Sequence, residues 1–476
     1  MRNHTRIKVI EEKYLQQIHD ASLKVLKETG IRFRNEKVID LFKKHGARVD
    51  NDIVYMQKKM VDSSLEKVPR TFNMAARNPL NSVTVGSEES PLLVQPNIGP
   101  VWVQDLEKGR RRATLDDCAN IQKIIQESSV IALSGGLPVD PIDIEPRHKH
   151  LYVLYETLKH SDKPLICWTV TGQQADQMLD LIEIAAGGKD KLLNNPYAAV
   201  SVDPITPLSW GTDSLDTIFA YAMRKQAVFL PPCVMPGVNG PISLLGSSVL
   251  QNTEILSGIV LTQLINPGNP VVYATSSSLP NLKTGDFVCG SPEVALMNTA
   301  NLQMAIDYYR IPCRTLCGAT DSKTVDYQAG YETMQSLMGG VLGGAHIILE
   351  CLGILDSIMI TSYEKMIIDE EIISRVMCIR EGLSDADMNL STDVIQEIGR
   401  DRSYLDHVTT LSRFRERWFP AISEWRNYGD WQAEGGPTLM EKAHKKFKQV
   451  LMNAPESKID RVLDRRLKSY IDSIVG

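Results

Sequence analysis

From about residue 92 onward, the chain repeats one pattern: a short apolar run, a turn, and an amphipathic segment of helical length. This alternation is typical of parallel β/α architecture, because each parallel strand needs a long crossover connection that a helix usually provides. The pattern predicts eight strands, near residues 92–103, 130–137, 164–170, 197–202, 227–231, 270–275, 312–317 and 346–352. Helices are expected between them.

Eight such units favour an α/β fold of the closed (β/α)8 barrel type, the TIM barrel, over an open doubly wound sheet. An open sheet of this size usually has fewer strands and a glycine-rich first turn, and no GxGxxG follows a predicted strand. The open sheet is the structural alternative. Thr114 and Asp117 have the spacing of a capping box, and Ser291 precedes a proline at a first helical position, so both mark helix starts.

Two extensions are expected to flank a barrel over residues 91–360. Residues 1–90 are predicted to form an N-terminal helical extension, in which Gly30 and Gly46 end helices. Residues 361–476 are highly charged and are predicted to form a C-terminal helical subdomain. Its aromatic residues are expected to pack it onto the barrel, with a docking surface as the alternative: Trp418, Phe419, Trp425, Tyr428 and Trp431.

Composition argues against several classes of function. The formal net charge of -6, from 52 Lys+Arg and 58 Asp+Glu, gives no general attraction for nucleic acid or anionic lipid. The charged N-terminus lacks the apolar stretch of a secretory signal, and the apolar runs are short for a membrane span, so we expect a cytoplasmic protein. The eight cysteines lack the spacing of a zinc site or a disulfide framework, so no metal site is predicted.

In a parallel barrel, reactive groups lie at the carboxyl ends of the strands and in the loops that follow. In this sequence those positions hold aromatic rings and small polar residues, with few pairs suited to acid–base work. Four rings are placed to form a cage for a cation, because ring faces attract a quaternary ammonium group: Trp168, Trp210, Tyr273 and Tyr327. Packing in the core is the alternative for each ring.

Residues 321–332 run from an acid-rich polar loop into an apolar helix. Asp326 is predicted to cap that helix, which leaves Asp321, Lys323 and Gln328 free to face a ligand. Asp321 is a candidate catalytic residue, and the other two are candidate substrate ligands. An ordinary solvated loop is the alternative.

His346 lies in the last predicted strand, with Glu350 four residues later, and both are candidate catalytic residues. The two side chains should point to the same side of a regular strand, where the histidine would orient a carboxylate or act near a leaving group. A satisfied core histidine is the alternative. No GxSxG motif occurs and no cysteine has an evident histidine and acid partner, so the nucleophile that attacks a bound quaternary ammonium must come from elsewhere.

Three segments together resemble the trimethylamine methyltransferase family: DLEKGRRRATLDD at residues 105–117, DSKTVDYQAGYE at 321–332 and LGILDSIMITSYEKMIIDEE at 352–371. The similarity runs through nearly the whole chain. The archaeal trimethylamine enzymes of this family carry pyrrolysine, whereas this chain has standard residues and resembles the bacterial branch that demethylates quaternary amines. The resemblance implies a methyltransferase for glycine betaine, proline betaine, carnitine or γ-butyrobetaine, with glycine betaine or a close relative favoured.

The resemblance also implies that the methyl acceptor is a cobalt(I) corrinoid on a separate small protein, with no cofactor bound in the chain itself. A quaternary nitrogen leaves as a tertiary amine without a proton, so the enzyme would mainly position and desolvate the substrate. Lys323, Arg314 or His346 would receive the substrate's carboxylate. The sequence is compatible with a homo-oligomer. Two other classes stay open: a barrel lyase or isomerase that uses Asp203, Lys323 and Glu350 for proton transfer, and a non-catalytic betaine-binding protein.

Overall fold

The computed structural model describes residues 6–87, 90–400 and 402–476. Its centre is a sheet of eight parallel strands in the order β6-β18-β17-β14-β13-β11-β10-β9. The sheet closes into a barrel, because the carbonyl of Val94 in β6 accepts backbone hydrogen bonds of 3.2 Å from both Ala132 and Leu133, just before β9. The barrel strands are β6 Leu93–Val94, β9 Ser134–Gly135, β10 Leu165–Trp168, β11 Ala198–Ser201, β13 Ala227–Leu230, β14 Val271–Thr275, β17 Cys313–Leu316 and β18 Ile347–Leu349.

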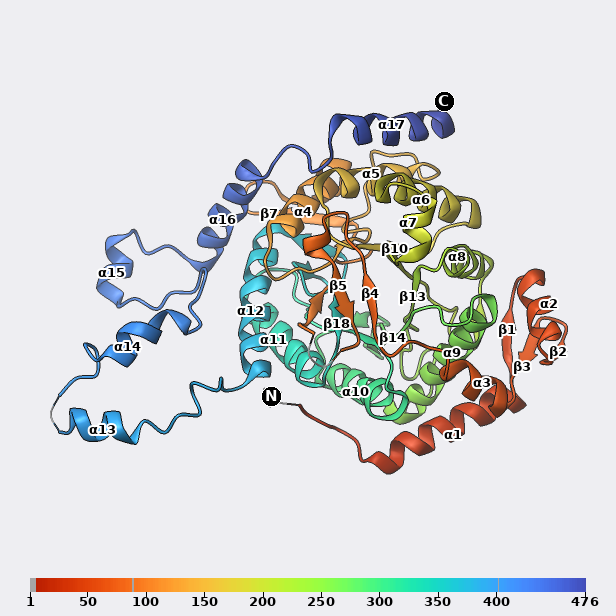
Figure 1. Cartoon of the computed structure of the whole chain (residues 1–476), viewed down its shortest axis with the longest axis horizontal. Coiled ribbons are helices and arrows are strands. Elements are labelled where there is room, and N and C mark those ends of the chain that lie inside the picture. The colour runs from red at the N-terminus through yellow and green to blue at the C-terminus, as the bar shows by residue number, and fades with distance from the viewer. Residues whose placement is uncertain (1–5, 88–89, 401) are drawn as a thin grey trace.

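A helix follows each barrel strand, and these helices surround the barrel (Figure 1). The predicted (β/α)8 barrel is therefore confirmed. The first predicted strand range is in fact two strands, β6 and β7 (Trp102–Asp105), because two prolines and Gly99, with φ of 103°, interrupt it. The barrel helices are α4 Leu115–Glu127, α5 Lys149–His160, α6 Gly172–Ala186, α8 Thr212–Met223, α9 Leu244–Ile265, α10 Pro292–Gln303, α11 Tyr327–Leu342 and α12 Tyr363–Glu381.

The predicted helix starts are confirmed. The carboxylate of Asp117 accepts a hydrogen bond of 2.9 Å from the backbone N–H of Thr114 at the start of α4. Ser291 caps α10, whose first residue is a proline, and Asp326 accepts a hydrogen bond of 3.0 Å from the third residue of α11. Two short helices extend this layer: α7 (Lys189–Asn194) after α6, and a π-helical turn (Met304–Tyr309) that continues α10.

Within the described ranges, α9 is the one helix that is long and apolar enough to cross a membrane, and 72% of its apolar stretch is buried inside the fold. It packs against the barrel on one side and against α1 (Glu12–Glu28) and α3 (Lys58–Leu65) on the other. The apolar surface around this helix is thus used for contacts within the chain.

The N-terminal extension contains strands as well as the predicted helices. The first 65 residues include a small sheet, which β12 of the barrel region joins, in the order β12-β1-β3-β2. Asn51, with φ of 53°, makes the tight turn between two of these strands. The sequence predicts the helices of this extension but not its strands, because strands of three residues are too short to show a periodicity. The elements are β1 Ile31–Phe33, α2 Glu36–Lys44, β2 Arg48–Asp50, β3 Ile53–Tyr55 and β12 Ser209–Trp210.

A hairpin of β4 (Phe72–Met74) and β5 (Val83–Val85) closes the amino end of the barrel; a 3-10 turn (Pro79–Asn81) lies in its loop. Its apolar side chains belong to one buried cluster with inward-facing barrel residues such as Ile166 and Val272. Figure 1 shows the hairpin lying across the barrel axis. Apolar side chains therefore fill the amino half of the lumen, and the polar groups of the lumen lie toward the carboxyl end.

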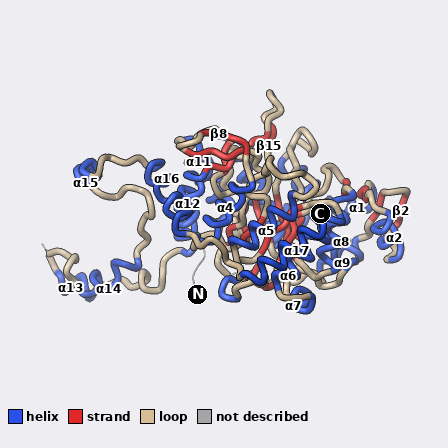
Figure 2. The backbone as a smooth tube through the Cα atoms, turned by 90° about the horizontal axis from the view of Figure 1, so that it is seen from above, coloured by secondary structure: helices blue, strands red, loops and turns tan. Residues whose placement is uncertain are grey.

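The loops after the barrel strands carry small sheets on the carboxyl face. After β14, β15 (Leu279–Pro280) and β16 (Phe287–Val288) form a hairpin. After β6 and β18, four short strands form a sheet in the order β19-β20-β7-β8. Figure 2 shows β8 and β15 on the same side of the molecule, at the carboxyl end of the barrel. The remaining bounds are β8 Gly109–Arg112, β19 Ile354–Leu355 and β20 Ile360–Ser362.

Beyond α12, the chain forms a projecting arm and then returns to the barrel, as Figures 1 and 2 show. Trp418 of the arm donates a hydrogen bond of 3.2 Å to Ser374 on α12, so this ring packs as predicted. Phe419, Trp425 and Tyr428 are exposed instead. The arm contains α13 Thr392–Ile398, α14 Val408–Arg413, the 3-10 turn Phe414–Glu416 and α15 Tyr428–Ala433, and the returning part contains α16 Leu439–Asn453 and α17 Arg461–Val475.

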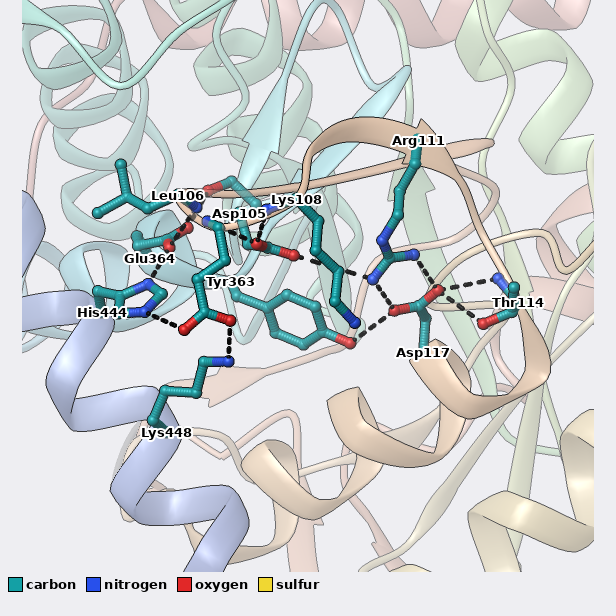
Figure 3. A network of polar contacts seen from close by, with 12 residues as sticks. Asp105, Leu106, Lys108, Arg111, Thr114, Asp117, Tyr363, Glu364, His444 and Lys448 are labelled. Atoms are coloured by element: carbon teal, nitrogen blue, oxygen red, sulfur yellow. Dashed lines mark hydrogen bonds and ion pairs between the residues drawn. The ribbon is translucent and has the colours of Figure 1, made fainter.

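A polar network fixes α16 to the turn between β7 and β8 (Figure 3). His444 on α16 contacts Glu364 at 2.7 Å and Glu107 at 3.2 Å, and Glu364 also accepts a hydrogen bond from the backbone N–H of Leu106. Burial disfavours the charged form of His444, but the hydrogen bonds to the two glutamates outweigh it and raise its pKa above the ordinary value. The C-terminal segment is therefore held to the barrel by charge-assisted hydrogen bonds.

Candidate active site at the carboxyl end of the barrel

Five polar side chains meet in the carboxyl half of the lumen. We call them the lumen cluster: Gln95, Ser201, Asp203, Arg314 and Glu350. Strand alternation explains why Arg314 faces inward: it pairs with Ala274 and Ile347, and both belong to the apolar cluster inside the barrel. The cluster thus lies directly above the apolar half of the lumen, at the end where barrel enzymes carry their active sites.

Arg314 is the centre of the lumen cluster. Its Nη1 donates hydrogen bonds to Ser201 Oγ at 3.1 Å and to Gln95 Oε1 at 3.4 Å, and its guanidinium lies 5.6 Å from the ring centre of Phe229. Its Nε and Nη2, which form one edge of the planar guanidinium, are buried and have no partner in the described part of the chain. Burial lowers its pKa to about 10, so the group stays charged at neutral pH. A buried, charged, two-donor edge suits a carboxylate.

Two acids flank Arg314, yet its hydrogen bonds go to Ser201 and Gln95 instead. Burial raises the pKa of Asp203 to about 6 and that of Glu350 to about 8, and the positive charge of Arg314 opposes both shifts. Asp203 is exposed although protein surrounds it, so solvent reaches it from the carboxyl end of the barrel. Because Arg314 makes no direct hydrogen bond to either acid, the guanidinium can bind the negative end of a dipolar ligand and an acid can bind its positive end.

The backbone around Glu350 is specialised. This residue follows β18 with φ of 57°, a left-handed conformation that takes its side chain out of the strand alternation. Its Oε1 accepts a hydrogen bond of 2.9 Å from the backbone N–H of Ile98, and its buried Oε2 has no partner among the described residues. Asn97 donates a hydrogen bond of 2.5 Å to the carbonyl of Leu352. The segments after β6 and β18 are thus tied together around this acid.

Of the four rings predicted to form a cation cage, one lies at the lumen. Trp168 ends β10, pairs with Ser201 and is half-buried at the carboxyl end. Tyr273 and Trp210 are buried, and both donate hydrogen bonds to α9, at 3.2 Å and 2.9 Å. The cage prediction was wrong for these two rings. Tyr273 pairs with Cys313 on the outward face of its strand, and Trp210 packs between the N-terminal sheet and the helix layer.

Tyr327 and the polar loop before it lie outside the lumen. Tyr327 is 94% exposed and lines a pocket of about 460 Å³ between α11, α12 and the C-terminal segment. Lys323 is exposed and pairs with Asp356 at 3.3 Å. Asp321 accepts hydrogen bonds of 2.8 and 2.9 Å from two backbone N–H groups after β16, and Gln328 donates to a glutamate one turn later. Asp321 and Lys323 are therefore not free as expected, because they join neighbouring loops, and Gln328 is held within α11.

His346 lies at the opposite end of the barrel from Glu350. It precedes β18, and its Nδ1 accepts a hydrogen bond of 3.1 Å from the backbone N–H of Cys313. Burial, with two nearby arginines, lowers its pKa to about 4. Four residues of extended strand span about 13 Å. The predicted partnership with Glu350 was therefore wrong, and His346 is a core histidine on the outward face.

Gln95 and Ser201 were not among the predicted site residues, and Asp203 was predicted only for the rival proton-transfer reaction. The signal for Ser201 was a polar residue at an inward position of the otherwise apolar strand β11. The signal for Gln95 was its position directly after β6. Among the residues that the structure describes, no group of three or more His, Cys, Asp or Glu side chains is placed to hold a metal ion.

Comparisons with known proteins agree with this geometry. A model of the family "Trimethylamine methyltransferase" matches residues 1–473. Glycine betaine methyltransferase of Desulfitobacterium hafniense is 36% identical over 97% of this chain and 96% of its own length. Proline betaine:corrinoid methyltransferase of Eubacterium limosum is 31% identical over 87% of each chain. A hydroxylamine complex of MtmB, a monomethylamine methyltransferase, has the same fold, with a TM-score of 0.53 and 11% identity over 94% of this chain and 88% of that one.

Proposed function

The chain belongs to the trimethylamine methyltransferase family, and from this premise we propose that it moves a methyl group from a quaternary amine to the cobalt of a corrinoid protein. Relatives named as methyltransferases for glycine betaine, proline betaine and L-carnitine support this choice of substrate class. Each of those substrates carries a quaternary ammonium group and a carboxylate. The proposal therefore predicts one site that recognises both charges.

The unpartnered Nε–Nη2 edge of Arg314 is the observation that carries the betaine proposal. Of the three residues predicted to receive the carboxylate, Arg314 is the one that lies in the lumen. Lys323 is exposed outside the lumen, and His346 lies at the other end of β18. Toward the open end, Asp203 and the half-buried ring of Trp168 suit the positive nitrogen. A short zwitterion such as glycine betaine fits this order of charges.

The residues of this chain would bind, orient and desolvate the substrate. With the carboxylate on Arg314, the methyl groups of the ammonium point toward the carboxyl face, where the acceptor approaches. The corrinoid protein supplies the nucleophile that takes the methyl group. No residue of the lumen cluster needs to give a proton to the leaving group, because the amine leaves as a neutral base.

The partners follow from the proposal. The acceptor is a separate corrinoid protein, which we treat as a substrate of this enzyme, and we place the reaction in the cytoplasm. The division into residues 1–90, 91–360 and 361–476 remains a proposal, as does a homo-oligomeric state. The exposed rings of the projecting arm, Phe419, Trp425 and Tyr428, are candidates for a docking surface.

The test is an assay of methyl transfer from glycine betaine to reduced cobalamin. The transfer is monitored by the spectral change from cobalt(I) to methyl-cobalt(III). Glycine betaine, proline betaine, carnitine and γ-butyrobetaine are compared with trimethylamine, which has neither a quaternary nitrogen nor a carboxylate. We expect transfer from at least one betaine and none from trimethylamine. No transfer from any quaternary amine would overturn the proposal.

A lyase or isomerase is the second candidate, because the raised pKa values of Asp203, about 6, and Glu350, about 8, bracket neutral pH. The same chain would then consume its substrate without a corrinoid. A non-catalytic betaine-binding protein would bind the substrate and leave it unchanged. Product analysis by mass spectrometry, with and without cobalamin, separates these outcomes: dimethylglycine formed only with cobalamin supports the methyltransferase.

A further inference from the structure

Glu350 and Gln95 each present one polar atom to the lumen that is buried and has no partner among the described residues. Gln95 uses its Oε1 to accept from Arg314, which leaves its Nε2, a donor. Glu350 uses its Oε1 to accept from Ile98, which leaves its Oε2. Buried polar atoms are costly unless a partner satisfies them, so this pattern points to a polar ligand beside Arg314.

We propose that Glu350 and Gln95 complete a carboxylate subsite around Arg314, in which Glu350 carries a proton and donates a hydrogen bond from Oε2 to the substrate. This inference rests on the proposed betaine substrate and adds the residues that read its carboxylate end. It makes Glu350 a neutral hydrogen-bond donor rather than an anion that attracts the ammonium.

Charge balance in the lumen supports the protonated form. With a betaine bound, Asp203, Glu350 and the substrate carboxylate would place three negative groups against two positive ones, the guanidinium and the ammonium, and the surplus of like charge in a buried site disfavours ionisation. Glu350 is the acid that retains its proton, since burial raises its pKa to about 8 against about 6 for Asp203. Among the described residues, the thiols of Cys289 and Cys351 also interact electrostatically with Glu350, and burial keeps both thiols neutral.

The hydrogen-bond pattern of Glu350 fits a neutral acid. The carbonyl-type oxygen of a protonated carboxyl accepts, as Oε1 does from Ile98, and the hydroxyl oxygen donates, as we assign to Oε2. The left-handed backbone at Glu350, with φ of 57°, fixes where that hydroxyl can point. Together with Nε and Nη2 of Arg314 and Nε2 of Gln95, the subsite offers donors only, which is what a carboxylate requires.

Titration calorimetry on the whole protein without corrinoid tests the subsite. Glycine betaine is the ligand, and choline, a quaternary amine without a carboxylate, is the comparison. Glu350→Gln keeps a neutral donor, whereas Glu350→Ala removes it. For glycine betaine we expect Glu350→Gln to bind within about threefold of wild type at neutral pH and Glu350→Ala to bind at least about tenfold more weakly, a loss of one hydrogen bond to a charged group. Gln95→Leu should also weaken glycine betaine, and choline binding should change in none of the variants.

The pH dependence distinguishes the two forms of Glu350. A proton donor predicts that wild-type binding of glycine betaine weakens as the pH rises past about 8, the value to which burial raises the pKa, and that Glu350→Gln is flat over this range. Glu370→Gln is the matched control, because Glu370 is a half-buried acid on α12 whose pKa burial also raises. It should keep the wild-type profile.

Two results overturn the inference: wild-type binding that strengthens above pH 8, or a loss of choline binding in Glu350→Gln. Either would show that Glu350 acts as an anion toward the ammonium. The methyl-transfer assay is read separately. If the enzyme transfers methyl groups but either of these binding results is found, the proposed subsite is wrong and the proposed function stands. If the variants bind as expected but no methyl transfer occurs, the proposed function is wrong and the subsite stands. Thermal unfolding of each variant shows whether the fold is intact.

Discussion

Replacing Arg314 with lysine tests how the substrate is held. Arg314 is 1% exposed and presents an unpartnered two-donor edge to the lumen, while Nη1 is fixed by Ser201 and Gln95. Lysine keeps the positive charge but has no planar edge, so it can make one directed contact with a carboxylate where arginine makes two. The substitution therefore removes the planar two-donor edge and keeps the positive charge.

The size of the effect follows from the lost hydrogen bond. A hydrogen bond to a charged group contributes about 1.5–3 kcal/mol, and about 1.4 kcal/mol corresponds to a factor of ten. Loss of one of the two bonds should raise KM for glycine betaine by roughly 10- to 150-fold. The fold should survive, because lysine also places a positive charge beside Asp203. We expect kcat at saturating substrate to change much less than KM, because the contact is made in both the ground and transition states.

The assay is initial-rate methyl transfer to free reduced cobalamin over a range of glycine betaine concentrations, with thermal unfolding as the check of the fold. Arg224→Lys is the matched control, since Arg224 pairs with Asp176 at 2.6 Å in the outer helix layer. It should leave KM unchanged. An unchanged KM in a folded Arg314→Lys enzyme would refute the reasoning that this edge holds the carboxylate.

Three further predictions concern the lumen and the C-terminal segment. Trp168→Leu should raise KM for glycine betaine by about 2- to 30-fold, the range of a cation–π contact of about 0.5–2 kcal/mol, whereas Trp210→Leu should lower the unfolding temperature, because that ring is buried in the core. Steady-state kinetics and thermal unfolding decide between these roles. The pKa of His444 is raised in the folded protein, so its contribution to stability should be complete below its ordinary value of 6.5 and should disappear as the pH rises through the raised value. Unfolding temperatures between about pH 5.5 and 9 should show this decline in the wild type and not in His444→Gln; a decline of equal size in both would assign it to other groups. Asp117→Asn should lower the free energy of unfolding by about 3 kcal/mol, toward the lower end for a broken buried ion pair because Arg111 is 28% exposed. Urea unfolding measures the loss, and a change below about 1 kcal/mol would show that the network of Asp117 contributes little.

The fold could be predicted because its signals are local and repeated. Most barrel strands lie in apolar runs, and several helices begin at a residue such as Ser291 or Asp326 whose side chain caps them. The short strands of the N-terminal extension have no such signal, since β1, β2 and β3 span three residues each and are fixed by pairing with one another and with β12. Their existence depends on contacts between distant segments, which periodicity does not report.

The candidate site was predicted in part, because position at a strand end does not decide which way a side chain faces. Trp168 and Tyr273 both lie near the carboxyl ends of barrel strands, yet one faces the lumen and the other faces α9. Strand pairing resolves them: Trp168 pairs with Ser201, which contacts Arg314, whereas Tyr273 pairs with Cys313, the neighbour of Arg314 on the opposite face. One inward residue therefore determines the orientation of its neighbours in register.

Glu350 is an exception to the rule that strand register determines the orientation of a side chain. From its spacing to His346, strand alternation places both side chains on the outward face, because Ile347 between them faces the lumen. His346 obeys the rule and contacts Cys313. Glu350 departs from it through a left-handed backbone, with φ of 57°, which non-glycine residues adopt at a cost of about 1–3 kcal/mol. Here the displacement brings an acid beside Arg314, with one oxygen that has no partner among the described residues. The backbone conformation and the unpartnered oxygen both support the proposed recognition of a substrate carboxylate at the end of β18.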